Sequence, residues 1–163
     1  MTSDCSRVAA YADAVLPLAG AALDDAYYYR SVSLCVIDAV YSIGVQYEGV
    51  QAVVRRYCDY FGLSRIRPNR EVLPPKHLQE SIGTLCEHYD DLGLERMTAE
   101  VFCNRQRTST RSGILKAEVV QRFALSLQCR GIEHLQDVSR FLPNESLERD
   151  IRAIPGQHSG ISF

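Results

Sequence analysis

The segment Leu147–Phe163 reads LERDIRAIPGQHSGISF, and it decides the fold expected at the end of the chain. Its apolar residues Leu147, Ile151 and Ile154 are spaced i, i+4 and i+7, which predicts one buried face of a short helix. Asn144 stands just ahead of this pattern and is a residue type that favours the N-cap position. We therefore expect a short amphipathic helix that begins near Asn144.

A Pro-Gly turn follows this helix. Pro155 cannot continue a helix, and Gly156 readily adopts the left-handed backbone angles found where helices end. His158 or Ser159 is placed to cap a second helix whose first residues are Gly160–Phe163. The two helices would form a hairpin, and the N-terminus of the second would present free backbone N–H groups, a common binding site for phosphate.

This pattern resembles the helix–hairpin–helix of the DNA glycosylase superfamily, the endonuclease III-like proteins. Two upstream segments resemble the same superfamily in the same order. Ser33–Phe61 resembles its central buried helix and the helix after it, and Arg111–Ala117 resembles its Lys-Ala segment before the hairpin. The resemblance covers most of Tyr28–Phe163. It implies an all-α fold, an orthogonal helical bundle whose C-terminal helix–hairpin–helix lies at residues 147–163.

The resemblance also implies binding of double-stranded DNA, with main-chain N–H groups of Gly156, His158 and Gly160 bound to backbone phosphate. If the chain is active, the implied activity is that of a base-excision DNA glycosylase, an N-glycosyl hydrolase. No catalytic residue is assigned, because Gly160 matches the position of the superfamily's nucleophilic lysine and the segment with the catalytic aspartate would follow Phe163. We expect the superfamily's C-terminal helices to be lacking, and a homo-oligomer or a partner to cover the face left bare.

The densest basic stretch of the sequence contains Arg105, Arg107, Arg111 and Lys116, interleaved with hydroxyl-bearing residues. Cations and hydroxyls in one loop suit a phosphate backbone, so the three arginines are candidate auxiliary DNA contacts. A solvated loop between two helices would have the same composition, and both interpretations remain open.

Three consecutive tyrosines, Tyr27–Tyr29, point in three directions around a helix, so at least one should reach the surface. Tyr28 and Tyr29 are candidates for stacking on an unpaired base. The alternative is boundary packing, in which the rings are buried and the hydroxyls reach water.

Further helices are expected at Asp4–Val15, Val32–Val45 and Val50–Phe61. The second of these is apolar on nearly all sides and should be the buried hub of the fold. Asp38 interrupts it, and this carboxylate is a general base, a cap of a neighbouring helix or a residue facing a crevice.

A fourth helix is expected to begin at Pro74-Pro75, with Leu78, Ile82, Leu85 and Tyr89 as its core face. Apolar periodicity predicts later helices around 94–101, 119–127 and 135–142. The sequence has no strand-like alternation of any length, so the expected fold class is all-α.

At 163 residues the chain suits one domain, and its net charge of −2 does not favour a dedicated nucleic-acid binder. The rival hypothesis is therefore a non-enzymatic helical scaffold or protein-interaction domain that has lost DNA binding. Six dispersed cysteines without metal-ligand spacing predict buried thiols, no metal and no disulfide frame. We expect no cofactor, no membrane association and a cytoplasmic location.

Overall fold

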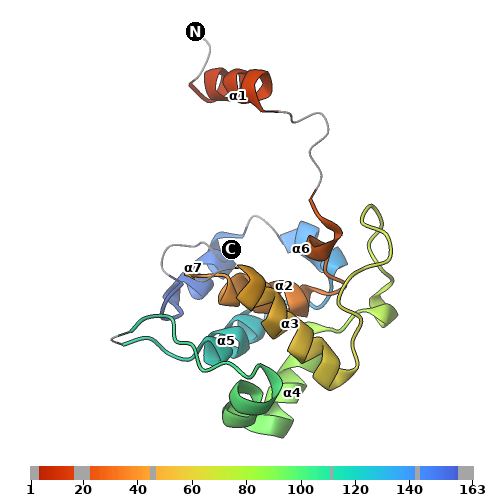
Figure 1. Cartoon of the computed structure of the whole chain (residues 1–163), viewed down its shortest axis with the longest axis vertical. Helices are drawn as coiled ribbons and strands as arrows, with labels where there is room; N and C mark the ends of the chain where they lie inside the picture. The colour runs from red at the N-terminus through yellow and green to blue at the C-terminus, as the bar shows by residue number, and fades with distance from the viewer. Residues whose placement is uncertain (1–3, 17–22, 45–46, 111, 142–143, 158–163) are drawn as a thin grey trace.

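The computed structural model describes residues 4–16, 23–44, 47–110, 112–141 and 144–157 (Figure 1). The α-helices within these ranges are α1 (Asp4–Val15), α2 (Val32–Tyr41), α3 (Tyr47–Phe61), α4 (Ile82–Arg96), α5 (Lys116–Gln128), α6 (Leu135–Phe141) and α7 (Glu145–Ala153). Three short helical turns accompany them: η2 (Asp25–Tyr27), η3 (Lys76–Leu78) and η4 (Met97–Val101). The described residues form two isolated β-bridges and no strand, so the all-α prediction is confirmed.

Helix α2 is the hub of the core. Its buried residues are Val32, Ser33, Leu34, Val36, Ile37, Val40 and Tyr41. It packs against α3, α4 and α5, as expected for a helix that is apolar nearly all round. The helix ends at Tyr41 instead of reaching Val45, because Ser42 is its C-cap and Gly44 has a left-handed φ of 70°.

Helix α3 also follows its sequence pattern, with Val50, Val53, Val54 and Tyr57 buried against the core. The prediction of a helix from Pro74-Pro75 was wrong. The chain makes only the turn η3 there, and α4 begins at Ile82, where the Ser81 hydroxyl caps it by accepting a hydrogen bond of 3.0 Å from the Thr84 N–H.

The residues between η3 and α4 explain this difference. Gln79 is extended at φ −109° and ψ 145°, and its side chain donates to the carbonyl of Pro74 at 2.6 Å. This bond holds the chain away from helical angles. As a consequence Leu78 is 47% exposed and lies outside the core, whereas Ile82, Leu85 and Tyr89 are buried as predicted.

The C-terminal helix α7 is built as expected from its sequence. Asn144 is the N-cap, and its side-chain oxygen accepts a hydrogen bond of 3.0 Å from the Leu147 N–H. Leu147 and Ile151 are buried, and α7 packs against α5. The second helix of the expected hairpin, at residues 158–163, lies outside the described residues.

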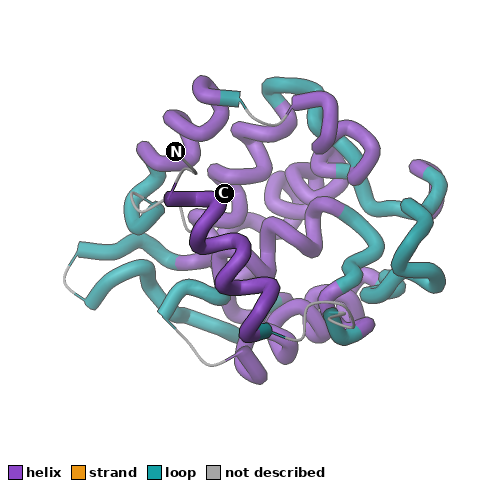
Figure 2. The backbone as a smooth tube through the Cα atoms, turned by 90° about the horizontal axis from the view of Figure 1, so that it is seen from above, coloured by secondary structure: helices purple, strands orange, loops and turns teal. Residues whose placement is uncertain are grey.

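Helix α1 stands apart from the other helices at one end of the molecule (Figure 1). None of its residues is buried. The body formed by α2–α7 is mostly helical, with loops at its edges (Figure 2). Among the described residues, no helix has both the length and the apolar composition needed to cross a membrane.

The cysteines are only partly where the sequence predicted. Cys58 and Cys86 are buried thiols and Cys35 is half-buried, but Cys5, Cys103 and Cys129 are exposed. The expectation of buried thiols was therefore wrong for half of them. Within the described residues, no group of three or more His, Cys, Asp or Glu side chains is arranged to hold a metal ion.

Candidate functional site

The expected turn at the end of α7 is present in the structure. The helix ends at Ala153, Ile154 is buried, and Gly156 follows with a left-handed φ of 92°. A Cβ atom placed on Gly156 would lie 2.3 Å from the Cβ of Thr108. No side chain fits in that space, so glycine at this position allows the turn to pack directly against the Thr108 side chain.

Thr108 belongs to the basic stretch, so the turn and the basic loop are adjacent. The loop, residues 104–115, folds back on itself like a β-hairpin and projects from the body beside α7 (Figure 1). An antiparallel bridge joins Arg107 to Leu115, and the Thr108 N–H donates to the carbonyl of Ile114 at 3.0 Å. The turn Ile154–Gln157 and this loop are called the turn–loop surface below.

The arginines of the loop have different environments. Arg107 donates from Nη1 to the carbonyl of Gly113 at 2.8 Å and so holds the two arms of the loop together. Arg105 is exposed and forms an ion pair with Glu95. Arg111 lies outside the described residues, as do His158 and Gly160. Of the six candidate phosphate contacts, the structure therefore places Gly156, Arg105 and Arg107, all on or beside the turn–loop surface.

Two buried polar side chains at this surface have no hydrogen-bond partner among the described residues. The side-chain amide of Gln157 is 1% exposed, and neither its nitrogen nor its oxygen is paired. The Thr108 hydroxyl is also buried and unpaired. Buried polar atoms are nearly always paired in proteins, so the Gln157 amide and the Thr108 hydroxyl are exceptions at this surface.

Lys116 follows the basic loop but is not part of its charged surface. It is 3% exposed, and its Nζ donates to the carbonyls of Tyr41 and Ile43 at 3.0 and 2.7 Å. These carbonyls lie at the C-terminal end of α2, where a cation also opposes the negative end of the helix dipole. Burial lowers the pKa of Lys116. The residue fastens α5 to α2 and is unavailable to an external phosphate.

The two tyrosines considered for base stacking differ in exposure. Tyr29 is 6% exposed and its hydroxyl donates to Asp38 Oδ2 at 2.6 Å, so its ring is not available to a base. Tyr28 is half-buried and its ring lies under the guanidinium of Arg67, 4.8 Å away. Tyr27 is the tyrosine that reaches the surface. Tyr28 and Tyr29 lie far along the chain from the Pro155-Gly156 turn, and no described contact joins them to it.

Asp38 is explained by its hydrogen bonds. Its carboxylate accepts from the Tyr29 hydroxyl and, at 3.1 Å, from the Ser42 hydroxyl. It therefore joins α2 to the segment before it. These hydrogen bonds give Asp38 a structural role that was not among the alternatives considered from the sequence.

A buried polar cluster that the sequence did not reveal lies around Glu80. One carboxyl oxygen accepts from the Ser33 hydroxyl of α2, and the other accepts from the Tyr57 hydroxyl of α3 at 2.7 Å. His88 of α4 lies with Nδ1 3.4 Å from the Glu80 carboxyl and 3.0 Å from the Tyr57 hydroxyl. Its ring stacks on Phe61 with centroids 3.6 Å apart.

The protonation of this cluster is set by burial. Burial raises the pKa of Glu80 to about 7, although the hydrogen bonds from Ser33 and Tyr57 act in the opposite direction. Burial also lowers the pKa of His88. Glu80 lines an open pocket of about 390 Å³ together with Arg30 and His77. Both carboxyl oxygens are occupied by internal donors, so the cluster joins three helices, and a catalytic role has no support in the geometry.

The comparisons with known proteins give a family and nothing finer. A family model described as a domain of unknown function, DUF8548, matches residues 6–163. The chain belongs to this family. A search of curated proteins found no match. A search of solved structures found none either. The family description names no ligand or activity.

Proposed function

We propose that this DUF8548 chain binds duplex DNA through backbone phosphates at the turn–loop surface. The observation that carries the proposal is the close approach of Gly156 to Thr108, because it makes one surface of two segments that each have phosphate-binding character. A glycine turn that follows a helix and a loop with arginines and hydroxyls are two kinds of group that hold a phosphate.

The helix α7, its Asn144 cap and the Pro155-Gly156 turn support a helix–hairpin–helix of the DNA glycosylase type as the finer fold. In this arrangement the main-chain N–H groups of Gly156, His158 and Gly160 would hold one phosphate. Arg105 and Arg107, together with Arg111, would contact neighbouring phosphates. We propose binding without a catalytic step, because Gly160 matches the position of the superfamily's nucleophilic lysine.

The binding is expected to depend on salt, since each phosphate neutralised by a cation releases condensed counterions. The test is fluorescence anisotropy with a short labelled duplex, undamaged or containing one abasic site, at low and moderate salt. Saturable binding that weakens as salt is added supports the proposal. Absence of binding at low salt contradicts it.

Matched substitutions localise the binding. Arg105→Gln removes an exposed arginine that pairs with Glu95, and Arg122→Gln removes an exposed arginine of α5 that pairs with Glu118. Both changes remove one charge and one surface ion pair. Only Arg105→Gln is expected to weaken binding, and equal effects of the two would reduce the interaction to a general charge effect.

A second candidate, a helical protein-interaction domain, is favoured by the exposed apolar residues of α1. It predicts no DNA binding at any salt concentration. The anisotropy titration is therefore done first, because it decides between the two hypotheses. If no DNA binding is found, a pull-down with the intact chain as bait follows.

A further inference from the structure

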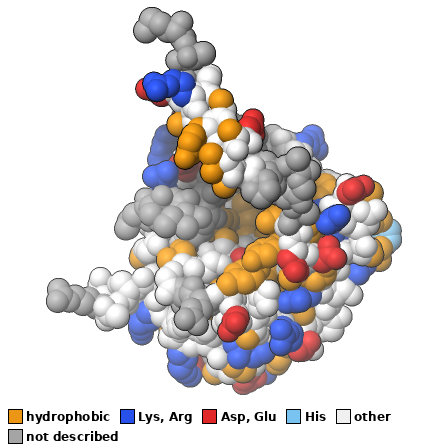
Figure 3. All heavy atoms as spheres, turned by 45° about the horizontal axis from the view of Figure 1, so that its top comes forward, with side chains coloured by type: hydrophobic (Ala, Val, Ile, Leu, Met, Phe, Trp, Pro, Cys, Tyr) orange, Lys and Arg blue, Asp and Glu red, His pale blue; other side chains and the backbone are white. Residues whose placement is uncertain are grey.

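Helix α1 carries an apolar face that the structure leaves in solvent. Val8, Tyr11 and Val15 are 68%, 71% and 58% exposed, and Leu16 just after the helix is also exposed. Their spacing of i, i+3, i+7 and i+8 places them on one side of the helix. Figure 3 shows these hydrophobic side chains gathered on α1. Such a stripe is characteristic of a helix that packs against another surface.

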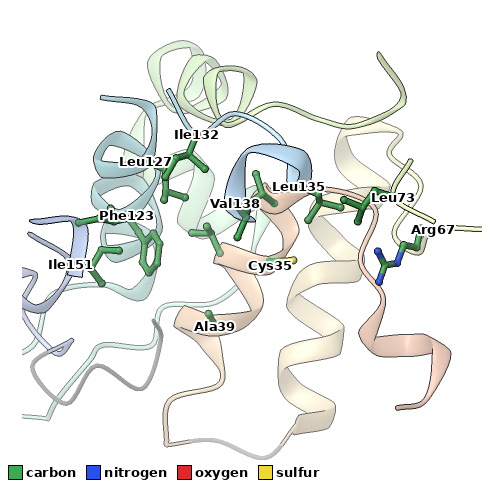
Figure 4. Close-up of a pocket in the computed structure, with 13 residues that line it drawn as sticks. Cys35, Ala39, Arg67, Leu73, Phe123, Leu127, Ile132, Leu135, Val138 and Ile151 are labelled. Carbon is green, nitrogen blue, oxygen red and sulfur yellow. The ribbon is translucent and has the colours of Figure 1, made fainter. Parts of the chain in front are cut away.

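The body of the molecule has an apolar groove with no side chain of α1 in it. This cavity of about 460 Å³ lies between α2, α5, α6 and α7. Figure 4 shows side chains from these four helices pointing into one space, among them Phe123, Val138 and Ile151. Leu73 at the rim is 42% exposed, and among the described residues that line the groove Arg67 alone is charged. The groove is therefore open and apolar, like the stripe on α1.

The chain that leads from α1 is anchored at the rim of this groove. The Arg67 N–H donates to the carbonyl of Tyr28 at 3.0 Å, and the Arg67 guanidinium covers the Tyr28 ring. Arg67 and Val32 both line the groove. The segment around Tyr28 is thus fixed beside the cavity.

The connection between α1 and this anchor is long enough for α1 to return to the groove. From Leu16 to Asp24, at about 3.3–3.6 Å per residue, the chain can span up to roughly 26–29 Å. Helix α1 itself is only about 18 Å long at 1.5 Å per residue. A segment tethered this close to its site meets it at a high effective concentration, which favours the same chain over a second copy.

We propose that the apolar groove is the docking site of α1 of the same chain. Val8, Tyr11 and Val15 enter the cavity, and the opposite face with Ala10 and Asp13 stays in solvent. The docked helix covers the groove between α2, α5, α6 and α7. This interaction surface is separate from the turn–loop surface and does not depend on the proposed binding of DNA.

Photo-crosslinking tests the proposal on the full chain. Tyr11→p-benzoylphenylalanine places a photoreactive ring in the apolar stripe, and Ala10→p-benzoylphenylalanine places the same ring on the opposite face. After irradiation, the products are separated by size and the crosslinked peptides are identified by mass spectrometry. We expect Tyr11→p-benzoylphenylalanine to crosslink within one chain to peptides from α2, α5, α6 or α7. The Ala10 variant should give about tenfold less of this product.

Two further measurements make the result decisive. The intrachain yield should not change on dilution, because docking within one chain is independent of concentration. Adding Leu73→Asp, which charges an exposed rim position and should leave the fold intact by circular dichroism, should lower the yield severalfold. Products that join two chains, or crosslinks that avoid the groove in a folded protein, would overturn the proposal.

Discussion

The carboxyl of Glu80 has a different proton affinity in the folded and the unfolded chain. Its pKa rises from an ordinary value of 4.5 to about 7 because burial disfavours the charged form. Between these two values the folded state keeps the proton that the unfolded state releases. The contribution of Glu80 to stability is therefore fully present below pH 4.5 and is lost as the pH rises to 7. A change of this size corresponds to about 3 kcal/mol.

We predict that Glu80→Gln removes this pH dependence. The amide has nearly the shape of the carboxyl and does not ionise, so it avoids the cost of a buried charge at high pH. Relative to the unsubstituted chain, the variant should gain about 3 kcal/mol in free energy of unfolding between pH 4.5 and pH 8. Urea denaturation across this range measures the difference.

His88 faces Glu80, and its own titration has the opposite sign. Its lowered pKa means that its contribution to stability is lost as the pH falls below 6.5. Comparison of Glu80→Gln with the unsubstituted chain at each pH removes most of this second effect, because His88 is present in both. If the two stability curves stayed parallel, the assignment of the raised pKa to Glu80 would be wrong.

Replacement of the buried Lys116 should cost more stability than replacement of the exposed Lys76. We predict that Lys116→Met destabilises the chain by about 3 kcal/mol, because two carbonyls at the end of α2 lose charged donors. The control is Lys76→Met. Lys76 is exposed over half of its side chain and pairs with the buried Asp137 at 2.8 Å. Asp137 also accepts from the N–H groups of Glu133 and His134, so the loss of Lys76 should cost about 1–2 kcal/mol. Equal unfolding free energies for the two variants would contradict the buried role.

The environments of Glu80 and Lys116 could not be predicted from the sequence. In the sequence Glu80 and Lys116 look like ordinary polar residues. The fold brings Ser33, Tyr57 and His88 to Glu80. It brings the C-terminal end of α2 to Lys116. No periodicity records contacts between residues so far apart in the chain. The burial of both groups therefore could not be predicted from the pattern.

At the scale of elements, the glycine of the turn should be irreplaceable. We predict that Gly156→Ala destabilises the chain by about 2–4 kcal/mol, since its Cβ would overlap Thr108 in addition to straining a left-handed φ. Gly62→Ala is the matched control. Gly62 has a φ of 67° with open space around it, so only the strain of about 1 kcal/mol applies. Chemical denaturation of both variants measures the difference.

A second change isolates the contact between the turn and the loop. Thr108→Gly removes the atoms that the new Cβ would meet, so it should recover part of the stability lost in Gly156→Ala. An additive double variant would mean that the turn and the loop do not touch.

The helices themselves were largely predictable. Apolar spacing predicted α3 and α7, cap and stop signals predicted α1, and Asn144 was placed correctly as the N-cap of α7. The failures occurred where a side chain competes with the backbone, as Gln79 does before α4. The hairpin-like shape of the basic loop was also missed, because main-chain hydrogen bonds join its two arms and such bonds leave no pattern of side chains in the sequence.

At the scale of the whole molecule, the net charge of −2 limits how DNA could be held. A protein without a broad basic surface gains little from long-range attraction, so binding would rest on a few local contacts. Three arginines belong to the basic loop: Arg105, Arg107 and Arg111. The logarithm of the binding constant should then fall against the logarithm of salt concentration with a slope of about −3.

This slope is the most direct measure of the turn–loop surface. Arg105→Gln should reduce its magnitude by about one, because one phosphate contact is lost, whereas Arg122→Gln should leave it unchanged. Gly156→Ala should weaken binding at every salt concentration with little change of slope, because main-chain N–H groups release no counterions of their own. A slope near zero, or one that Arg105→Gln and Arg122→Gln change equally, would mean that phosphate is not bound at this surface. The groove and α1 would then be the functional part of the fold to pursue.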